Sequence, residues 1–139
     1  MTTEHPARTA GKKSMSAAER KAKDEWLDLY ADDAKIEDPV GPSPMDPEGN
    51  GHAGKAAIAA FWDNNIANTG LKFEIRDSFA CGQEAANVGA IHLSFPNGAT
   101  ALCEGVFKYR VNDEGKITSL RAFWELDRMM ATMTQPPTS

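Results

Sequence analysis

The sequence lacks three features that would each define a broad class of protein. It contains no run of about 18 apolar residues, so we expect no transmembrane helix and no membrane partner. Basic residues number 15 against 20 acidic ones, and the net charge of −5 argues against nucleic acid as a partner, because phosphate binding needs a basic face. The first residues hold no apolar core of the signal-peptide kind.

Cysteine and histidine are also scarce. The two cysteines, Cys81 and Cys103, match no metal-binding spacing, and nothing in the spacing brings the three histidines together. We therefore expect no metal and no other cofactor. With no export signal, both cysteines are interpreted as reduced thiols in a cytoplasmic protein.

The 139 residues are enough for one domain with a real core and one modest pocket. Residues 1–13 and 131–139 are rich in small and polar side chains and are predicted to be tails. This leaves a single domain over residues 14–130.

The domain begins with helical periodicity. Apolar residues recur every three or four positions over residues 16–30, where Ser16 and Glu19 form a capping-box signature. Residues 41–54 are rich in glycine and proline and predict a loop, after which residues 55–68 predict a second helix.

From Leu71 onward the apolar period changes to two, which is typical of strands. Turn residues separate four strand-like runs, near residues 71–80, 86–95, 99–111 and 116–127, and a short strand is predicted at 35–38. Helices followed by a meander of strands predict an α+β fold: a curved antiparallel sheet with the N-terminal helices packed on its concave face, forming a cone-shaped pocket.

Three segments resemble the bacterial ketosteroid isomerases, within the nuclear-transport-factor-like (SnoaL-like) superfamily. They are LYADDAKIEDPVG (29–41), GKAAIAAFW (54–62) and YRVNDEGKITSLRAFW (109–124), and the resemblance covers residues 16–128. It implies a cofactor-free isomerase that moves a double bond in a 3-oxo steroid or a similar cyclic ketone, a reaction well known for carboxyl pKa tuning. It also implies that Asp38 is the general base.

The site of this family has hydrogen-bond donors for the substrate oxygen that the sequence does not match. The resemblance implies a tyrosine and a protonated aspartic acid, whereas alignment places Ser14 and Phe107 at these positions. Because losing one such donor typically costs about 10²–10³ in rate, the donors are replaced, the substrate differs, or the pocket only binds.

Strand parity predicts which residues face the pocket. If Phe107 points inward, Cys103 does too, and alignment across the 96–98 turn places His92 and Ser94 beside them. His92 is then a candidate donor that pairs with Asp38, or alternatively a hydrogen-bonded interior residue. The expected wall for a small apolar ligand consists of Phe61, Trp62, Ser94, Cys103, Phe107, Leu120 and Trp124.

Other interpretations remain open. Asp38 before Pro39 also suits a turn, and the fold hosts other enzymes, such as epoxide hydrolases, dehydratases and polyketide cyclases, as well as non-catalytic binding or dimerisation modules. A homodimer is expected because the sheet face away from the helices, predicted to carry Ile91, Leu93, Phe95 and Phe123, needs cover.

Overall fold

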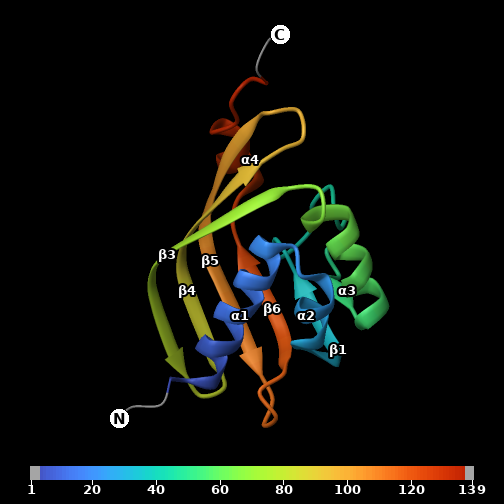
Figure 1. Cartoon of the computed structure of the whole chain (residues 1–139), viewed down its shortest axis with the longest axis vertical. Helices are drawn as coiled ribbons and strands as arrows, with labels where there is room; N and C mark the ends of the chain where they lie inside the picture. Colours follow the sequence, from blue (N-terminus) through green and yellow to red (C-terminus); the bar gives the residue numbers. More distant parts are fainter. Residues whose placement is uncertain (1–3, 137–139) are drawn as a thin grey trace.

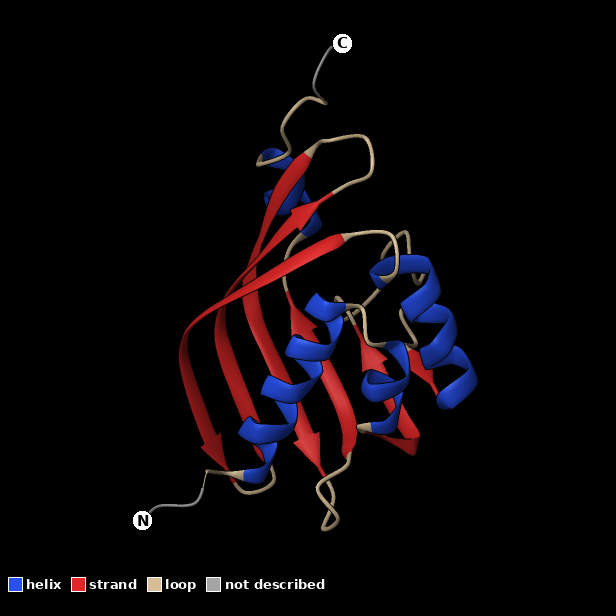
Figure 2. Ribbon diagram, in the orientation of Figure 1, coloured by secondary structure: helices blue, strands red, loops and turns tan. Residues whose placement is uncertain are grey.

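The computed structural model describes residues 4–136, which form an α+β domain with six strands in one curved, open sheet (Figures 1 and 2). The strand order is β2–β1–β6–β5–β4–β3. The strands are β1 (Tyr30–Glu37), β2 (His52–Ala53), β3 (Gly70–Cys81), β4 (Glu84–Ser94), β5 (Thr100–Val111) and β6 (Ile117–Phe123). The predicted fold class is confirmed, with the refinement that β1 runs parallel to β6, so the sheet is mixed.

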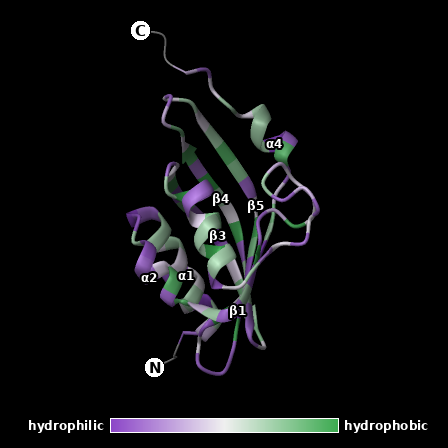
Figure 3. Ribbon diagram, turned by 90° about the vertical axis from the view of Figure 1, so that its right-hand side faces the viewer, coloured by the Kyte–Doolittle hydropathy of each residue, from purple (hydrophilic) through white to green (hydrophobic). Residues whose placement is uncertain are grey.

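The helices are α1 (Pro6–Arg20), α2 (Lys23–Asp28), α3 (Lys55–Phe61), the π-helical turn η1 (Trp62–Ile66) and α4 (Leu126–Ala131). Helices α1 and α2 lie on one face of the sheet, whereas α4 lies near the beginning of β5, away from them, as the side view in Figure 3 shows. The largest fully buried side chains between these layers are Trp26, Tyr30, Ile36, Ile58 and Ile117. None of the described helices combines the length and the apolar surface needed to cross a lipid bilayer.

Helix α1 begins at Pro6, so the structure corrects the predicted tail boundary at residue 13. Proline is favoured in the first helical turn, and the His5 Nδ1 atom accepts a hydrogen bond from the Ala7 amide at 3.1 Å. Ala7 and Ala10 are buried against the sheet. The small, polar composition that suggested a tail is that of a helix packed closely on strands.

The predicted single helix over residues 16–30 is two helices. Lys21 adopts a left-handed conformation with φ of 60°, which ends α1, and its ammonium group donates to the Ile66 carbonyl at 2.8 Å. The predicted capping box is also wrong, because Ser16 lies inside α1. The Glu19 carboxylate instead accepts a hydrogen bond from the Phe73 amide at 2.8 Å, at the start of β3.

The last strand ends at Phe123, earlier than the predicted residue 127, and the chain continues into α4. Beyond α4, Thr132 Oγ1 accepts a hydrogen bond from the Leu102 amide and Thr134 Oγ1 accepts one from the Thr100 amide, each at 2.8 Å. This part of the predicted C-terminal tail therefore lies along the beginning of β5. Residues 1–3 and 137–139 of the predicted tails lie outside the described residues.

Candidate active site

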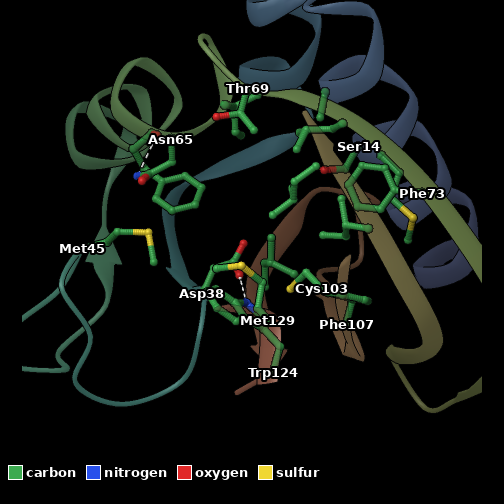
Figure 4. Close-up of a pocket in the computed structure, with 18 of the residues that line it drawn as sticks. Ser14, Asp38, Met45, Asn65, Thr69, Phe73, Cys103, Phe107, Trp124 and Met129 are labelled. Atoms are coloured by element: carbon green, nitrogen blue, oxygen red, sulfur yellow. Dashed lines mark hydrogen bonds between the residues drawn. The ribbon is translucent and has the colours of Figure 1, made fainter. Parts of the chain in front are cut away.

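The Asp38 side chain points into the hollow between the helices and the sheet (Figure 4). Asp38 follows the last residue of β1, and the peptide bond to Pro39 is cis. One carboxylate oxygen, Oδ1, accepts a hydrogen bond of 2.6 Å from the indole Nε1–H of Trp124, just after β6. Within residues 4–136, no hydrogen bond engages the other oxygen, Oδ2.

Two further contacts with β6 fix the Asp38 backbone. Glu37 accepts a hydrogen bond from Arg121 Nε at 2.6 Å, and the Val40 amide donates to the Ala122 carbonyl at 2.9 Å. The residues on both sides of Asp38 are thus attached to β6, the strand that leads into Trp124. These contacts hold the Asp38 carboxylate in a fixed orientation toward the cavity.

Compared with water, the surroundings of Asp38 stabilise the protonated carboxyl relative to the carboxylate. Burial raises the pKa of this carboxyl above its usual value, because the ionised form loses hydration. The Trp124 hydrogen bond and the nearby His52 imidazole lower the pKa and offset part of this effect. The His52 ring centroid lies 5.0 Å from that of Phe61, a cavity-lining residue, so the end of the predicted 41–54 loop lies beside the site.

The cavity beside Asp38 has a volume of about 400 Å³, within the roughly 300–1,000 Å³ of small-molecule sites. Its walls are mainly apolar. They include Met15, Phe61, Leu71, Phe73, Ile91, Leu93, Phe95, Phe107, Leu120 and Met129. A carboxylate in such a hollow is suited to take a proton from carbon.

A cluster of hydroxyl groups adds polarity to this cavity. Ser14 and Tyr109 both line it, and the Ser14 hydroxyl lies 3.0 Å from the hydroxyl of the buried Tyr30. Burial raises the pKa of Tyr109, with a smaller opposing effect of the Ser14 hydroxyl and a further rise from the Asp38 charge. If Tyr30 donates to Ser14, the Ser14 proton is free for a ligand oxygen. The raised pKa keeps the Tyr109 hydroxyl protonated, so it can also donate a hydrogen bond.

Most of the predicted wall lies where we expected it. Phe61, Cys103, Phe107, Leu120 and Trp124 all line the cavity. Cys103 is not activated, because burial and the Asp38 charge raise the pKa of its thiol to about 12.

Trp62 is the exception among the predicted aromatic residues of the wall. It is buried, and its ring centroid lies 5.0 Å from that of Trp26, so it packs in the core and does not line the cavity.

The predicted inward orientation of His92 and Ser94 is wrong. The loop between β4 and β5 pairs Phe95 with Ala99 (Phe95 N to Ala99 O, 2.9 Å), which sets Ile91 opposite Cys103. The parity of β4 is therefore shifted by one residue from our alignment. His92 and Ser94 are exposed on the opposite face, where His92 Nε2 lies 3.1 Å from the Glu74 carboxylate.

The same shift places Ile91, Leu93 and Phe95 in the cavity, although we expected them on a dimer-forming face. Sequence reasoning also missed the polar residues Asn64, Asn65 and Thr69 and the methionines Met45 and Met129. The strand pattern could have placed Ile91 and Leu93 once the loop length was known. The 41–51 loop carries no periodic signal, and the helical pattern of residues 55–68 does not show that the turn widens at η1.

The Trp124 hydrogen bond predicts a shift in pH dependence. In Trp124→Phe the ring is kept but the N–H donor is lost, so we expect the Asp38 pKa to rise further. For any reaction that uses the Asp38 carboxylate as a base, the acid limb of the pH–rate profile, where the rate falls as the carboxylate is protonated, then moves to higher pH. A profile with an unmoved acid limb would show that Trp124 does not tune this group.

The fold and the cavity define a class: a single-domain α+β protein with an apolar site beneath its N-terminal helices. Residues 12–120 match the model of the SnoaL-like domain, and the chain belongs to this family.

Three solved structures are similar over nearly the whole chain. RV0760c from Mycobacterium tuberculosis is 39% identical, with 96% of this chain and 98% of that chain covered and a TM-score of 0.87. The same protein in complex with estradiol-17beta-hemisuccinate is 38% identical, covering 95% and 100%, with a TM-score of 0.86. The Delta 5-3-ketosteroid isomerase from Mycobacterium sp. is 38% identical, covering 94% and 98%, with a TM-score of 0.85.

Proposed function

We propose that this protein is a cofactor-free isomerase that acts on a 3-oxo steroid or a similar cyclic ketone. The observation that carries the proposal is the Asp38 carboxylate, which faces an apolar cavity with one oxygen held by Trp124. A ketosteroid isomerase and a steroid-bound protein among the similar structures support the ligand class.

In the proposed reaction, the Asp38 carboxylate takes a proton from the carbon next to the ketone. The electron pair of that C–H bond forms a new carbon–carbon double bond, and charge develops on the ketone oxygen. The resulting carboxylic acid returns the proton two carbons further on, which moves the original double bond into conjugation. No electrons leave the substrate, so the step needs no redox partner.

Ser14 and Tyr109 are the proposed donors to the ketone oxygen. They take over from the tyrosine and aspartic acid that the resemblance implied, because Phe107 occupies the acid position with a side chain that cannot donate. Donors fixed in a dry cavity stabilise developing charge more strongly than donors in water.

The direct test is incubation with a Δ5-3-oxo steroid while the absorbance of the conjugated enone is followed. We expect catalysed conversion above the buffer rate. A protein that leaves the enone signal at the buffer rate would reject the isomerase proposal.

One observation favours a second candidate, steroid binding without turnover. Phe107 removes a donor from the cavity, and an apolar residue there strengthens ligand packing while weakening catalysis. Saturable quenching of tryptophan fluorescence by the steroid, with no enone formed, would support this alternative, since Trp26 and Trp124 both line the cavity.

We also propose a homodimer that forms through the outer face of the sheet. Val88, Val106 and Phe123 are successive cross-strand partners and form an apolar stripe, with Phe123 42% exposed. Lys108 and Arg121 flank the stripe on one side, and Glu104 lies on the other. A two-fold axis that runs along the stripe places the basic flank of one copy opposite the acidic flank of the other.

Light scattering after size-exclusion chromatography tests the dimer. We expect a dimer for the native chain and a monomer for Phe123→Lys, because a charge would then be buried at the stripe. Met130→Lys, which changes an exposed residue of α4, serves as the control and should remain dimeric. A monomeric native protein would reject this interface.

We also propose that the protein is cytoplasmic. Cys81 and Cys103 are free thiols, which fits a reducing compartment.

A further inference from the structure

The cavity has a second polar group of residues, well separated in sequence from Asp38 and the hydroxyl cluster. Asn64, Asn65 and Thr69 line the cavity at its partly exposed edge, and we refer to them as the amide rim. In Figure 4, Asn65 and Thr69 lie in the upper part of the view, across the cavity from Phe107 and Trp124. The wall between the rim and the hydroxyl cluster is mostly apolar.

The π-helical turn η1 accounts for this arrangement. The Ala67 amide donates to the Trp62 carbonyl at 2.9 Å, five residues back, so the turn holds one residue more than an α-helical turn. The wider turn presents both Asn64 and Asn65 to the cavity. Turns of this kind are rare and occur frequently at functional sites.

The amide rim retains hydrogen-bonding capacity. Asn65 Nδ2 donates one of its two protons to the Phe61 carbonyl at 3.2 Å, which leaves the second N–H as a donor for a ligand oxygen and Oδ1 as an acceptor. Within residues 4–136, no hydrogen bond engages the Thr69 hydroxyl, which can both donate and accept. A ligand that covered these groups with hydrocarbon alone would remove their water and leave them unsatisfied.

We propose that the amide rim binds a second oxygen, a hydroxyl or carbonyl group, at the end of the ligand that is distant from Asp38. The substrate class is then a rigid, elongated polycyclic ketone with oxygen at both ends. This inference rests on the proposed function in one respect, namely that the reacting ketone lies beside Asp38. The rim itself acts in binding and not in proton transfer. A site built to hydrogen-bond an oxygen discriminates against the analogue that lacks it.

The test compares two 3-oxo-4-ene steroids that differ only at carbon 17, one with a ketone there and one without oxygen. Dissociation constants are measured by tryptophan fluorescence or calorimetry. We expect the native protein to bind the 17-oxo compound about three- to tenfold more tightly, the effect of one hydrogen bond. Equal affinities for the two compounds would overturn the inference.

Substitutions in the amide rim test whether it is the source of the preference for the 17-oxo compound. Thr69→Val keeps the side-chain shape and removes the hydroxyl, so we expect the preference to shrink while affinity for the deoxygenated compound is kept or improved. Asn65→Ala is the second variant, and Asn68→Ala, an exposed neighbour that does not line the cavity, is the control. A preference that survives in both rim variants would show that these residues do not read the oxygen.

The two proposals fail in different ways. A native protein that prefers the 17-oxo compound but forms no enone from a Δ5-3-oxo steroid contradicts the isomerase proposal and leaves the amide rim supported. A protein that catalyses isomerisation but binds both compounds equally contradicts the amide rim alone.

Discussion

Asp38→Asn is expected to lower the isomerisation rate constant by about 10²–10⁴, the usual contribution of a positioned base. The amide has nearly the same shape, and its oxygen can still accept the Trp124 hydrogen bond, so the cavity should be preserved. Only the ability to take a proton from carbon is lost. Steady-state kinetics on a Δ5-3-oxo steroid measures the effect.

Asp33→Asn is the matched control, since this carboxylate lies on β1, the strand that leads into Asp38, but is exposed. It should leave the rate unchanged. An Asp38→Asn enzyme with the native rate would remove Asp38 from the base role.

The same substitution should change the pH dependence of stability. Because the pKa of Asp38 is raised in the folded protein, the folded state holds this proton at pH values where the unfolded chain has released it. The native protein therefore loses stability as the pH rises through that window. We expect the unfolding free energy of Asp38→Asn, relative to that of the native protein, to increase as the pH rises through this window. Denaturant unfolding at several pH values measures the difference.

Ser14→Ala is expected to lower the rate constant by about 10²–10³, the typical cost of one donor to a developing oxyanion. The loss should fall mainly on kcat, because the donor acts most strongly when charge has developed on the ketone oxygen. The variant also leaves the buried Tyr30 hydroxyl without its 3.0 Å partner, so its melting temperature needs to be recorded alongside the rate.

Two further variants separate these effects. Tyr30→Phe removes the same buried hydroxyl pair from the other side and keeps the Ser14 hydroxyl, so it should retain more activity than Ser14→Ala. Ser16→Ala, on the same helix but outside the cavity wall, is the control. A Ser14→Ala enzyme that keeps the native kcat would assign the donor role elsewhere, with Tyr109 as the next residue to test.

The parts of the fold that the sequence predicted are those with long periodic patterns. The four long strands were expected within a few residues of their observed bounds, except for the end of β6. The apolar pattern did not predict the N-terminal part of α1. Ala7 and Ala10 are small residues, and their burial depends on close packing of α1 against the sheet. The break at Lys21 is invisible in the sequence, since a lysine in a left-handed conformation carries no local signal.

The orientation of a site residue could be predicted within a contiguous motif, whereas orientations that depend on strand register could not. Asp38 was identified from a contiguous segment, and its orientation into the cavity agrees with that interpretation. His92 was misplaced because a change of one residue in strand pairing exchanges the two faces of β4. The Trp124–Asp38 hydrogen bond joins residues 86 positions apart, and no local pattern could reveal it.

The attachment of the Asp38 segment to β6 has a consequence for biosynthesis. Arg121, Ala122 and Trp124 leave the ribosome long after Asp38, so a nascent chain carries the carboxylate with none of the three contacts that position it. The segment acquires its working geometry only when the end of the domain has been translated. In recombination between relatives, residues 37–40 and 121–124 accordingly need to be inherited together.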